Sequence, residues 1–312
     1  MRLIRTLLTL LVPGVLLTGC FTGVESTPKI TYKDVKNNKV AETTPEQQFA
    51  RELVSPRFSQ WRSGKEFYVT SPRISLVLSA DAPAAAMPVE GDTLVLMSSR
   101  DVPDLTGRQV VELVFSRKTQ PHQTFVYRTN ATRDDLTERA EVEIPFTIDL
   151  DFVADAASRL VGRELFVRTP LWFNADGEPV SGRKFVKVRI TGVRAANEVY
   201  PLFVLFTDEK GDSRGLFMSG AGQSRWAPRD FSALFSMGNP RLEYPQISDA
   251  MWADIVNTRV AEGMTKQEVS LAIGMPESID RGYNQNAAYE RWNYPDGRYL
   301  LFEDGLLMRF NR

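Results

Sequence analysis

The chain has 312 residues and a formal net charge of −1, and charged residues make up 25% of it. This balance gives no basic excess of the kind that holds nucleic acid, and no acidic tail. The length is enough for about two domains. One His and one Cys occur in the whole sequence, which excludes an internal disulfide and any site built from several such residues.

The chain begins with a segment typical of an export signal. Two arginines precede an apolar stretch at residues 7–17, which is shorter than the roughly 20 residues of a membrane-spanning helix. The stretch ends in Leu17-Thr18-Gly19-Cys20, which resembles the lipobox of bacterial lipoproteins. The resemblance implies that residues 1–19 are a signal peptide and that Cys20 carries the lipid, which anchors the protein through acyl chains such as palmitate. The alternatives are an uncleaved signal anchor and an ordinary signal peptide with a chance Cys.

The residues after the lipid site indicate where the protein is sorted. Cys20 is followed by Phe21 rather than Asp, which in enteric bacteria indicates the outer membrane. Residues 22–27 contain a single acid, so they lack the acidic run of some surface-exposed lipoproteins. We therefore expect a lipid-anchored protein on the periplasmic face of the outer membrane. Residues 20–43 are polar and aperiodic, which predicts a flexible tether.

Residues 44–150 are predicted to form a helix followed by short strands. Thr44 and Pro45 suit the N-cap and the first helical position, and Pro56 ends the helix. Runs of β-branched and aromatic residues follow, with turn residues between them. These runs are residues 67–69, 74–78, 93–97, 110–115, 124–127 and 142–148.

Residues 151–245 show the same order of a helix followed by strands. The predicted helix covers residues 151–161, with Asp149 or Asp151 as its N-cap and Gly162 at its end. The predicted strands are residues 165–167, 171–173, 185–190, 200–206 and 215–218.

Two motifs suggest that these two segments are copies of one unit. Gly64–Pro72 can be laid over Gly162–Pro170, and Leu105–Val111 over Val180–Val186. The first copy then needs an insertion, which the Ala-, Pro- and Gly-rich residues 80–92 supply. We interpret each copy as a small barrel-like antiparallel module, SH3-like or OB-like. The alternative is a chance likeness in strand and turn composition.

Residues 246–312 are predicted to form a last domain of order ααβββ, which makes the whole chain a β-rich α+β protein. The first helix runs from Ser248 to Gly263, and a capping box of Thr265 and Glu268 begins the second. The predicted strands are residues 289–294, 298–302 and 306–310, joined by Pro-Asp-Gly and Glu-Asp-Gly turns.

This last segment resembles the SmpA/OmlA/BamE-like lipoprotein domain. The matching positions are Gly263-Met264-Thr265, Glu268-Val269, Ile273-Gly274-Met275-Pro276, Trp292-Asn293-Tyr294 and Leu301–Leu306. Most of them are caps, turns and core residues, so they indicate a fold more than an activity. The resemblance implies a role in assembling outer-membrane proteins, or the binding and inhibition of a protein.

The sequence offers few side chains for catalysis. The lipid uses Cys20 and the only His is His122, so we predict no Ser-His-Asp triad, metal site or other cofactor. Asp149 with Asp151, or Asp208 with Glu209, has the residue types of a glycosidase pair. A helix cap and an exposed turn are the simpler interpretations, and we expect a protein that is not an enzyme.

Three aromatic residues, Trp172, Phe173 and Trp226, are candidates for an exposed interaction surface, with a place in the core as the alternative. Two functions remain open. The first is an interaction or scaffold protein for outer-membrane assembly or maintenance, with an envelope protein as its partner. The second is a lipoprotein that binds peptidoglycan or another glycan through its β modules. Neither involves nucleic acid.

Overall fold

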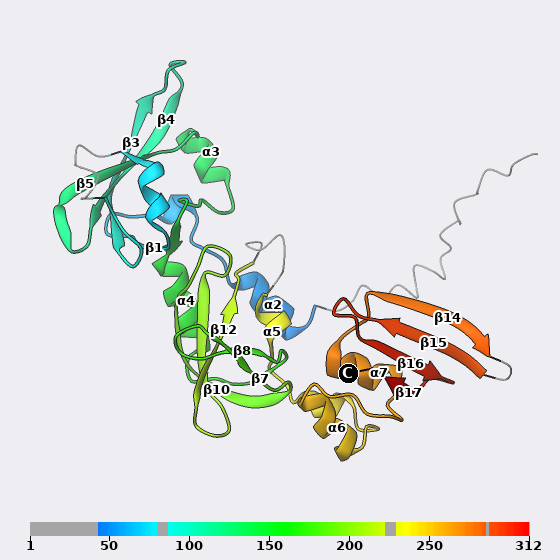
Figure 1. Ribbon diagram of the computed structural model, residues 1–312. Helices are drawn as coiled ribbons and strands as arrows, with labels where there is room; N and C mark the ends of the chain where they lie inside the picture. The colour runs from blue at the N-terminus through cyan, green and yellow to red at the C-terminus, as the bar shows by residue number, and fades with distance from the viewer. Residues whose placement is uncertain (1–42, 80–86, 222–228, 285–286, 312) are drawn as a thin grey trace, which may run out of the picture. The chain divides into compact units, whose positions relative to one another are not determined.

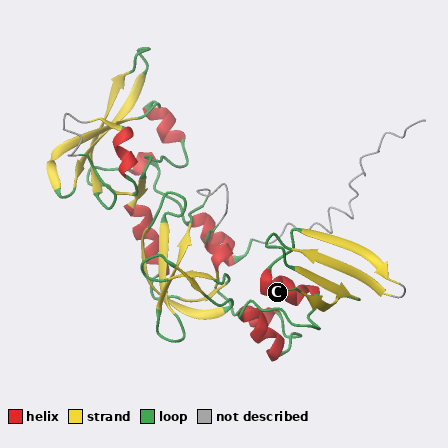
Figure 2. Ribbon diagram, in the orientation of Figure 1, coloured by secondary structure: helices red, strands yellow, loops and turns green. Residues whose placement is uncertain are grey.

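The computed structural model describes residues 43–79, 87–221, 229–284 and 287–311. They form three antiparallel sheets of six, seven and four strands, which follow one another along the chain (Figure 1). The protein is β-rich, as predicted, and its sheets are curled in the manner of a half-barrel. Helices and loops separate the strands (Figure 2). No helix in these residues is long and apolar enough to cross a membrane.

The first sheet has the strand order β2-β5-β4-β3-β1-β6. Its strands are β1 (Glu66–Val69), β2 (Leu78–Ser79), β3 (Thr93–Pro103), β4 (Gln109–Arg117), β5 (Gln120–Arg128) and β6 (Thr147–Asp149). The short helices around them are η1 (Phe58–Gln60), η2 (Pro72–Leu76) and α3 (Arg133–Glu138). Phe67, Phe115 and Phe125 are fully or almost fully buried in its core.

Two of the strands predicted for this segment are wrong. Residues 74–78 lie mostly in η2, because the Ser71 hydroxyl accepts a hydrogen bond from the amide of Arg73 and Pro72 takes the first helical position. Of the run 142–148, only the last two residues belong to a strand. Helix α3, with Thr132 as its N-cap, was not predicted.

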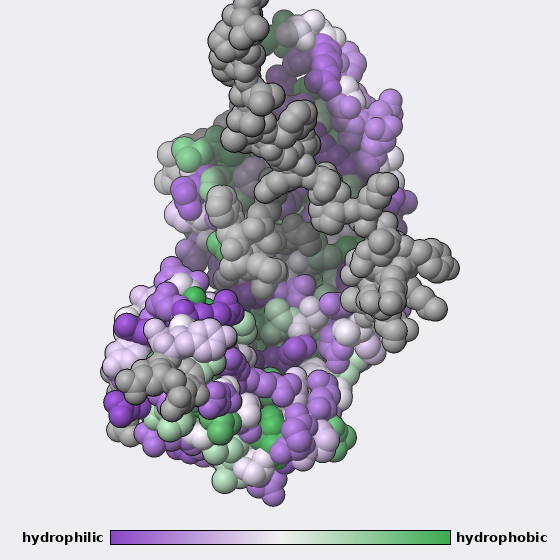
Figure 3. Space-filling model, turned by 90° about the vertical axis from the view of Figure 1, so that its right-hand side faces the viewer, coloured by the Kyte–Doolittle hydropathy of each residue, from purple (hydrophilic) through white to green (hydrophobic). Residues whose placement is uncertain are grey.

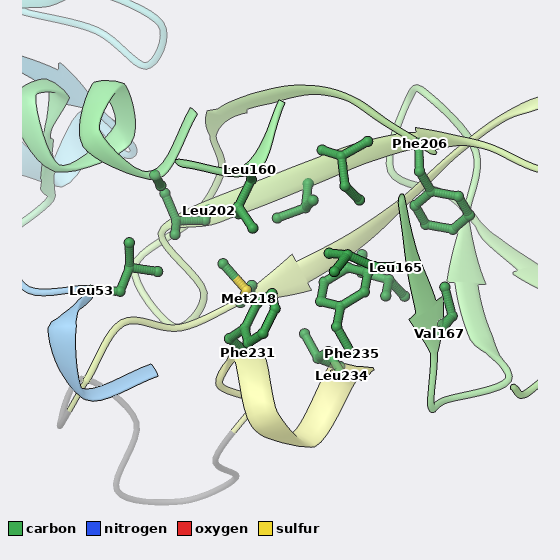
Figure 4. Packing of buried hydrophobic residues seen from close by; sticks show 14 of the residues in the cluster. Leu53, Leu160, Leu165, Val167, Leu202, Phe206, Met218, Phe231, Leu234 and Phe235 are labelled. Carbon is green, nitrogen blue, oxygen red and sulfur yellow. The ribbon is translucent and has the colours of Figure 1, made fainter. Parts of the chain in front are cut away.

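The second sheet has the strand order β13-β7-β10-β11-β12-β8-β9. Its strands are β7 (Glu164–Val167), β8 (Leu171–Phe173), β9 (Pro179–Ser181), β10 (Val186–Ala195), β11 (Leu202–Thr207), β12 (Ser213–Met218) and β13 (Phe235–Ser236). The helices that pack on it are α2 (Pro45–Glu52), α4 (Leu150–Leu160) and α5 (Phe231–Leu234). Figure 4 shows side chains from the strands, α4 and α5 converging on one core.

Helix α2 begins where it was predicted but packs in an unexpected place. Thr44 forms a capping box with Gln47, and the helix continues from Pro45. Phe49 in the helix and Leu53 at its C-cap are buried in the core of the second sheet, and the rings of Phe49 and Phe231 lie 4.3 Å apart. The helix therefore packs on the second sheet, whereas the sequence predicts it as part of the first module.

The first two sheets follow the same path. Each strand of the first sheet has a counterpart in the second sheet, with the same order along the chain and the same neighbours. The pairs are β1 with β7, β2 with β8, β3 with β10, β4 with β11, β5 with β12 and β6 with β13, and β9 has no counterpart. The Gly64 amide donates to the carbonyl of Leu96 (2.8 Å), as the Gly162 amide does to that of Ile190 (2.9 Å). A β-bulge follows directly in both β3 and β10. The predicted overlay of Gly64–Pro72 on Gly162–Pro170 thus joins equivalent places.

The second predicted overlay is wrong. Residues 105–111 span the turn between β3 and β4, whereas residues 180–186 run from β9 into β10. The two share turn chemistry, with a Gly between polar residues, but they do not share a place in the fold.

The C-terminal residues form a four-stranded meander with two helices. Its elements are α6 (Asp249–Val256), α7 (Lys266–Ile273), β14 (Ser278–Asn284), β15 (Ala287–Asn293), β16 (Tyr299–Glu303) and β17 (Leu306–Phe310). The predicted order ααβββ therefore lacks one strand, β14. The first helix also ends at Val256 instead of Gly263, because Thr258 has a left-handed φ of 54°. The capping box of Thr265 and Glu268 is confirmed.

Several large apolar side chains are exposed on the described surface. In the face that Figure 3 shows, hydrophilic residues predominate on the described surface and hydrophobic ones form small, separate patches. Leu105 is fully exposed at the turn between β3 and β4, and Leu76 and Leu242 are exposed in separate short helices. Isolated apolar side chains of this kind are ordinary on soluble proteins.

Candidate functional site

The residues predicted for an interaction surface do not come together in one exposed patch. Cys20 and Trp226 lie outside the described residues. Trp172 is 3% exposed and belongs to the core of the second sheet, so its assignment to a surface is corrected. Its ring packs against Phe206 at 5.1 Å, and its indole N–H donates to the carbonyl of Thr169 (2.9 Å). Both the ring and its polar atom are therefore used inside the fold.

Phe173 differs from its neighbour because successive residues of a strand point to opposite faces. It lies half-buried and contacts Phe217 (4.7 Å between ring centroids), which in turn contacts Phe203. The guanidinium of Arg194 lies 4.4 Å from the centroid of Phe203. The three rings form a small aromatic cluster, in which Phe203 is fully buried and Phe173 is half-buried.

Arg229 lies at the edge of this cluster. Its guanidinium is 5.4 Å from the ring of Tyr200 and 5.9 Å from that of Phe173, at cation–π distance. Its Nε and Nη2 are buried and have no hydrogen-bond partner in the part of the chain that the structure describes. Burial lowers the pKa of Arg229 below its ordinary value, and the tyrosine opposes this change. Arg229 and these rings thus form a cation–aromatic contact. Of the two predicted surface residues that the structure describes, Phe173 takes part in it and Trp172 does not.

A cavity of about 380 Å³ lies next to the junction of β6 and α4 and was not predicted. It is lined by Ser55, Phe67, residues 141–149, Phe152, Glu198 and Pro201. Four of these lining residues are acids, namely Glu141, Glu143, Asp149 and Glu198, and no lining residue that the structure describes is basic. We call this the acidic cavity. Such a lining attracts a cationic group such as an amine or a guanidinium.

Asp149 joins the acidic cavity to a buried ion pair. The ammonium of Lys65 lies 2.6 Å from Oδ1 of Asp149 and 2.5 Å from Oδ2 of Asp151. Lys65 has a side chain only 2% exposed, and its ammonium also lies over the rings of Trp61 and Phe67. The lysine is thus neutralised by two carboxylates and enclosed by aromatic rings.

The second oxygen of Asp149 is left without a partner. Oδ1 accepts bonds from Lys65 and from the amide of Asp151, so the predicted N-cap of the helix is confirmed. Oδ2 is buried and has no hydrogen-bond partner in the described structure. Burial raises the pKa of Asp149 above its ordinary value, and Lys65 opposes that change.

The other predicted carboxylates and the histidine have structural or solvent-exposed positions. Asp208 accepts hydrogen bonds from the amides of Lys210 and Asp212, which is the turn that was predicted. Glu209 pairs with Arg183 at 2.6 Å. His122 is exposed in β5. The two predicted carboxylate pairs therefore serve a helix cap and a turn.

The acidic cavity was missed because its residues come from distant parts of the sequence. The signal in the sequence is the run Glu141-Val142-Glu143, whose last two residues fall within the predicted strand at residues 142–148. No protein-family model and no curated protein matches this chain.

Proposed function

We propose that this protein is a lipid-anchored, non-enzymatic interaction protein of the bacterial envelope, acting in outer-membrane assembly or maintenance. The lipobox-like Leu17-Thr18-Gly19-Cys20 supports the anchor and the outer-membrane location. The SmpA/OmlA/BamE-like motifs of residues 250–310 support a role beside outer-membrane proteins. In this proposal the curled first two sheets are SH3-like or OB-like modules, and the last segment is a BamE-like domain extended by strand β14.

The acidic cavity is the observation that carries the binding part of the proposal. A cavity of about 380 Å³ that is lined by four acidic residues and by no described basic residue suits a Lys or Arg side chain of an envelope protein. The partner's charge would also steer association, because carboxylates in a concave surface focus the field. The glycan-binding alternative is weaker, because Trp172 is in the core and unavailable for stacking on a sugar ring.

Purification of the full chain from mildly solubilised membranes tests this proposal. We expect one envelope protein in stoichiometric amount, and we expect the double variant Glu143→Gln/Glu198→Gln to retain much less of it. Glu90→Gln, an exposed acid in a turn outside the acidic cavity, is the matched control. Equal recovery with both variants would show that the acidic cavity is not the contact. A chain that purifies alone and binds isolated sacculi would overturn the proposed function.

A further inference from the structure

A second cavity, of about 260 Å³, lies beside η1 and the β-bulge of β3. Its floor is apolar, since Phe58, Trp61 and Leu96 are all buried. The rings of Phe58 and Trp61 lie 5.3 Å apart, and the indole N–H of Trp61 donates to the carbonyl of Pro56 (3.1 Å). The indole N–H is therefore already used, and the polar chemistry of this cavity comes from its rim.

Two arginines stand on the rim and differ in how they are held. Arg62 donates from Nη1 to the carbonyls of Ser59 (2.9 Å) and Trp61 (2.8 Å). Carbonyl oxygens fix a guanidinium without neutralising it, and no carboxylate of the described residues lies within 4.0 Å of Arg62. Arg62 therefore keeps a full positive charge and has further N–H groups to donate.

The second arginine is partly neutralised. Arg133 donates from Nε to Asp101 (3.1 Å) and from Nη1 to the hydroxyl of Ser99 (3.2 Å). Its ion pair is exposed, with 40% of the arginine side chain and 46% of the aspartate side chain accessible. The rim thus carries two guanidinium groups, one of which pairs with the carboxylate of Asp101 outside the lining, so that one positive charge is left over.

Hydroxyl groups complete the rim. Ser59, Ser63 and Ser98 are exposed residues of the cavity lining, and no hydrogen bond occupies their side chains in the described structure. Ser98 follows the bulge at which β3 shifts register against β4, and a bulge re-aims the side chains beside it. A rim of guanidinium and hydroxyl donors matches an acceptor with several oxygens better than a neutral ligand.

We propose that this cavity binds a phosphate group, with Arg62 as its main charged contact and the serine hydroxyls as further donors. The volume is below the roughly 300–1,000 Å³ of pockets for drug-sized ligands, so the bound part is a small phosphorylated headgroup or free phosphate. Arginine is suited to the role because its planar fork donates two parallel hydrogen bonds to phosphate oxygens. The proposal concerns a different site from the acidic cavity and does not depend on it.

Calorimetric titration of the full chain in detergent tests the proposal with two probes. Inorganic phosphate represents the free anion, and glycerophosphoglycerol represents a lipid headgroup with a phosphodiester. Binding of phosphate alone identifies a site for free phosphate or a phosphomonoester. Binding of both identifies a site open to a lipid headgroup. Binding of neither overturns the proposal.

Variants locate the binding. Arg62→Gln should raise the Kd of whichever probe binds by about tenfold or more, since a charge-assisted hydrogen bond is lost. Arg62→Lys should retain part of the affinity, because it keeps the charge but not the fork. Arg57→Gln, an exposed neighbour outside the cavity lining, is the matched control. An unchanged Kd in Arg62→Gln, or an equal loss in the control, would place the binding elsewhere. Near-ultraviolet circular dichroism checks that the variants are folded.

Discussion

Gly182 lies directly against the indole ring of Trp172. A Cβ atom built on Gly182 would lie 2.2 Å from Cγ of that ring, closer than any real Cβ contact. The φ angle of Gly182 lies outside the left-handed region, so the need for glycine comes from crowding alone. The ring cannot move away, because it packs on Phe206 and its N–H is bonded to Thr169.

The substitution Gly182→Ala should therefore destabilise the fold by about 2 kcal/mol, a typical cost of overpacking. Urea unfolding followed by tryptophan fluorescence measures this change. Gly238→Ala is the control, because nothing lies within 4 Å of a Cβ at Gly238 and its φ is also outside the left-handed region. Equal stability of the two variants would show that the ring of Trp172 gives way easily.

The buried ion pair of Lys65 gives a second prediction. Lys65→Met should cost about 3 kcal/mol of stability, because Asp149 then stays buried without its cation. Lys118→Met is a suitable control, since Lys118 pairs with Glu66 but has a side chain 58% exposed. Exposed pairs contribute about 0–1 kcal/mol, so the control should change stability little.

The same ion pair can be tested by a double-mutant cycle. The variant Lys65→Met/Asp149→Asn should recover part of the stability lost in Lys65→Met, because a neutral amide costs less to bury than a charge. Chemical unfolding of the four chains of the cycle measures the coupling. Additive losses would mean that Asp151 or solvent, rather than Lys65, compensates the charge of Asp149.

The sequence predicts those parts of the fold that depend on local chemistry. The predicted N-cap at Thr44 and the predicted capping box at Thr265 are confirmed because each depends on residues only a few positions apart. Strand β14 was missed because its sequence, Ser-Ile-Asp-Arg-Gly-Tyr-Asn, is polar and has no regular apolar alternation. It forms by pairing with β15, whose Tyr289 ring covers Gly282 of β14.

The candidate sites depend on contacts between distant residues, which no local pattern contains. Trp172 and Phe173 are adjacent and similar in sequence, yet the alternation of the strand sends one into the core and the other to the opposite face. Lys65 meets its partner 84 positions away. Periodicity and turn chemistry therefore predict elements well, but they do not predict which charged side chains meet.

Glu290 gives a prediction on pH. Its carboxylate accepts a hydrogen bond from the indole of Trp292 (3.1 Å) and pairs with Lys266 and Arg281. The Trp292 hydrogen bond, together with these cations, lowers the pKa of Glu290 from 4.5 to about 2. A carboxylate with a lowered pKa in the folded state stabilises the fold above its unfolded pKa. That contribution is present above pH 4.5 and is lost as the pH falls to about 2.

Glu290→Gln removes this contribution, so the variant should be less stable than the parent at pH 6. The difference should shrink steadily between pH 4.5 and 2. Urea unfolding at several pH values measures it, with Glu262→Gln, an exposed acid, as the control. A difference that stays constant with pH would mean that the glutamine loses packing or hydrogen bonds rather than charge.

Cys20 gives the prediction on which the proposed location depends. The chain should incorporate labelled palmitate when it is expressed in a Gram-negative host, and Cys20→Ser should abolish the label because a hydroxyl does not replace the thiol as acceptor. Thr18→Ser keeps a small residue within the lipobox-like motif and should retain the label. Mass spectrometry of the mature N-terminus should show that residues 1–19 are absent. A chain that retains residues 1–19 and carries no label would mean that the segment is a signal anchor, which would then hold the protein on the membrane by itself. Label in the Cys20→Ser variant would mean that the lipid is attached at another residue.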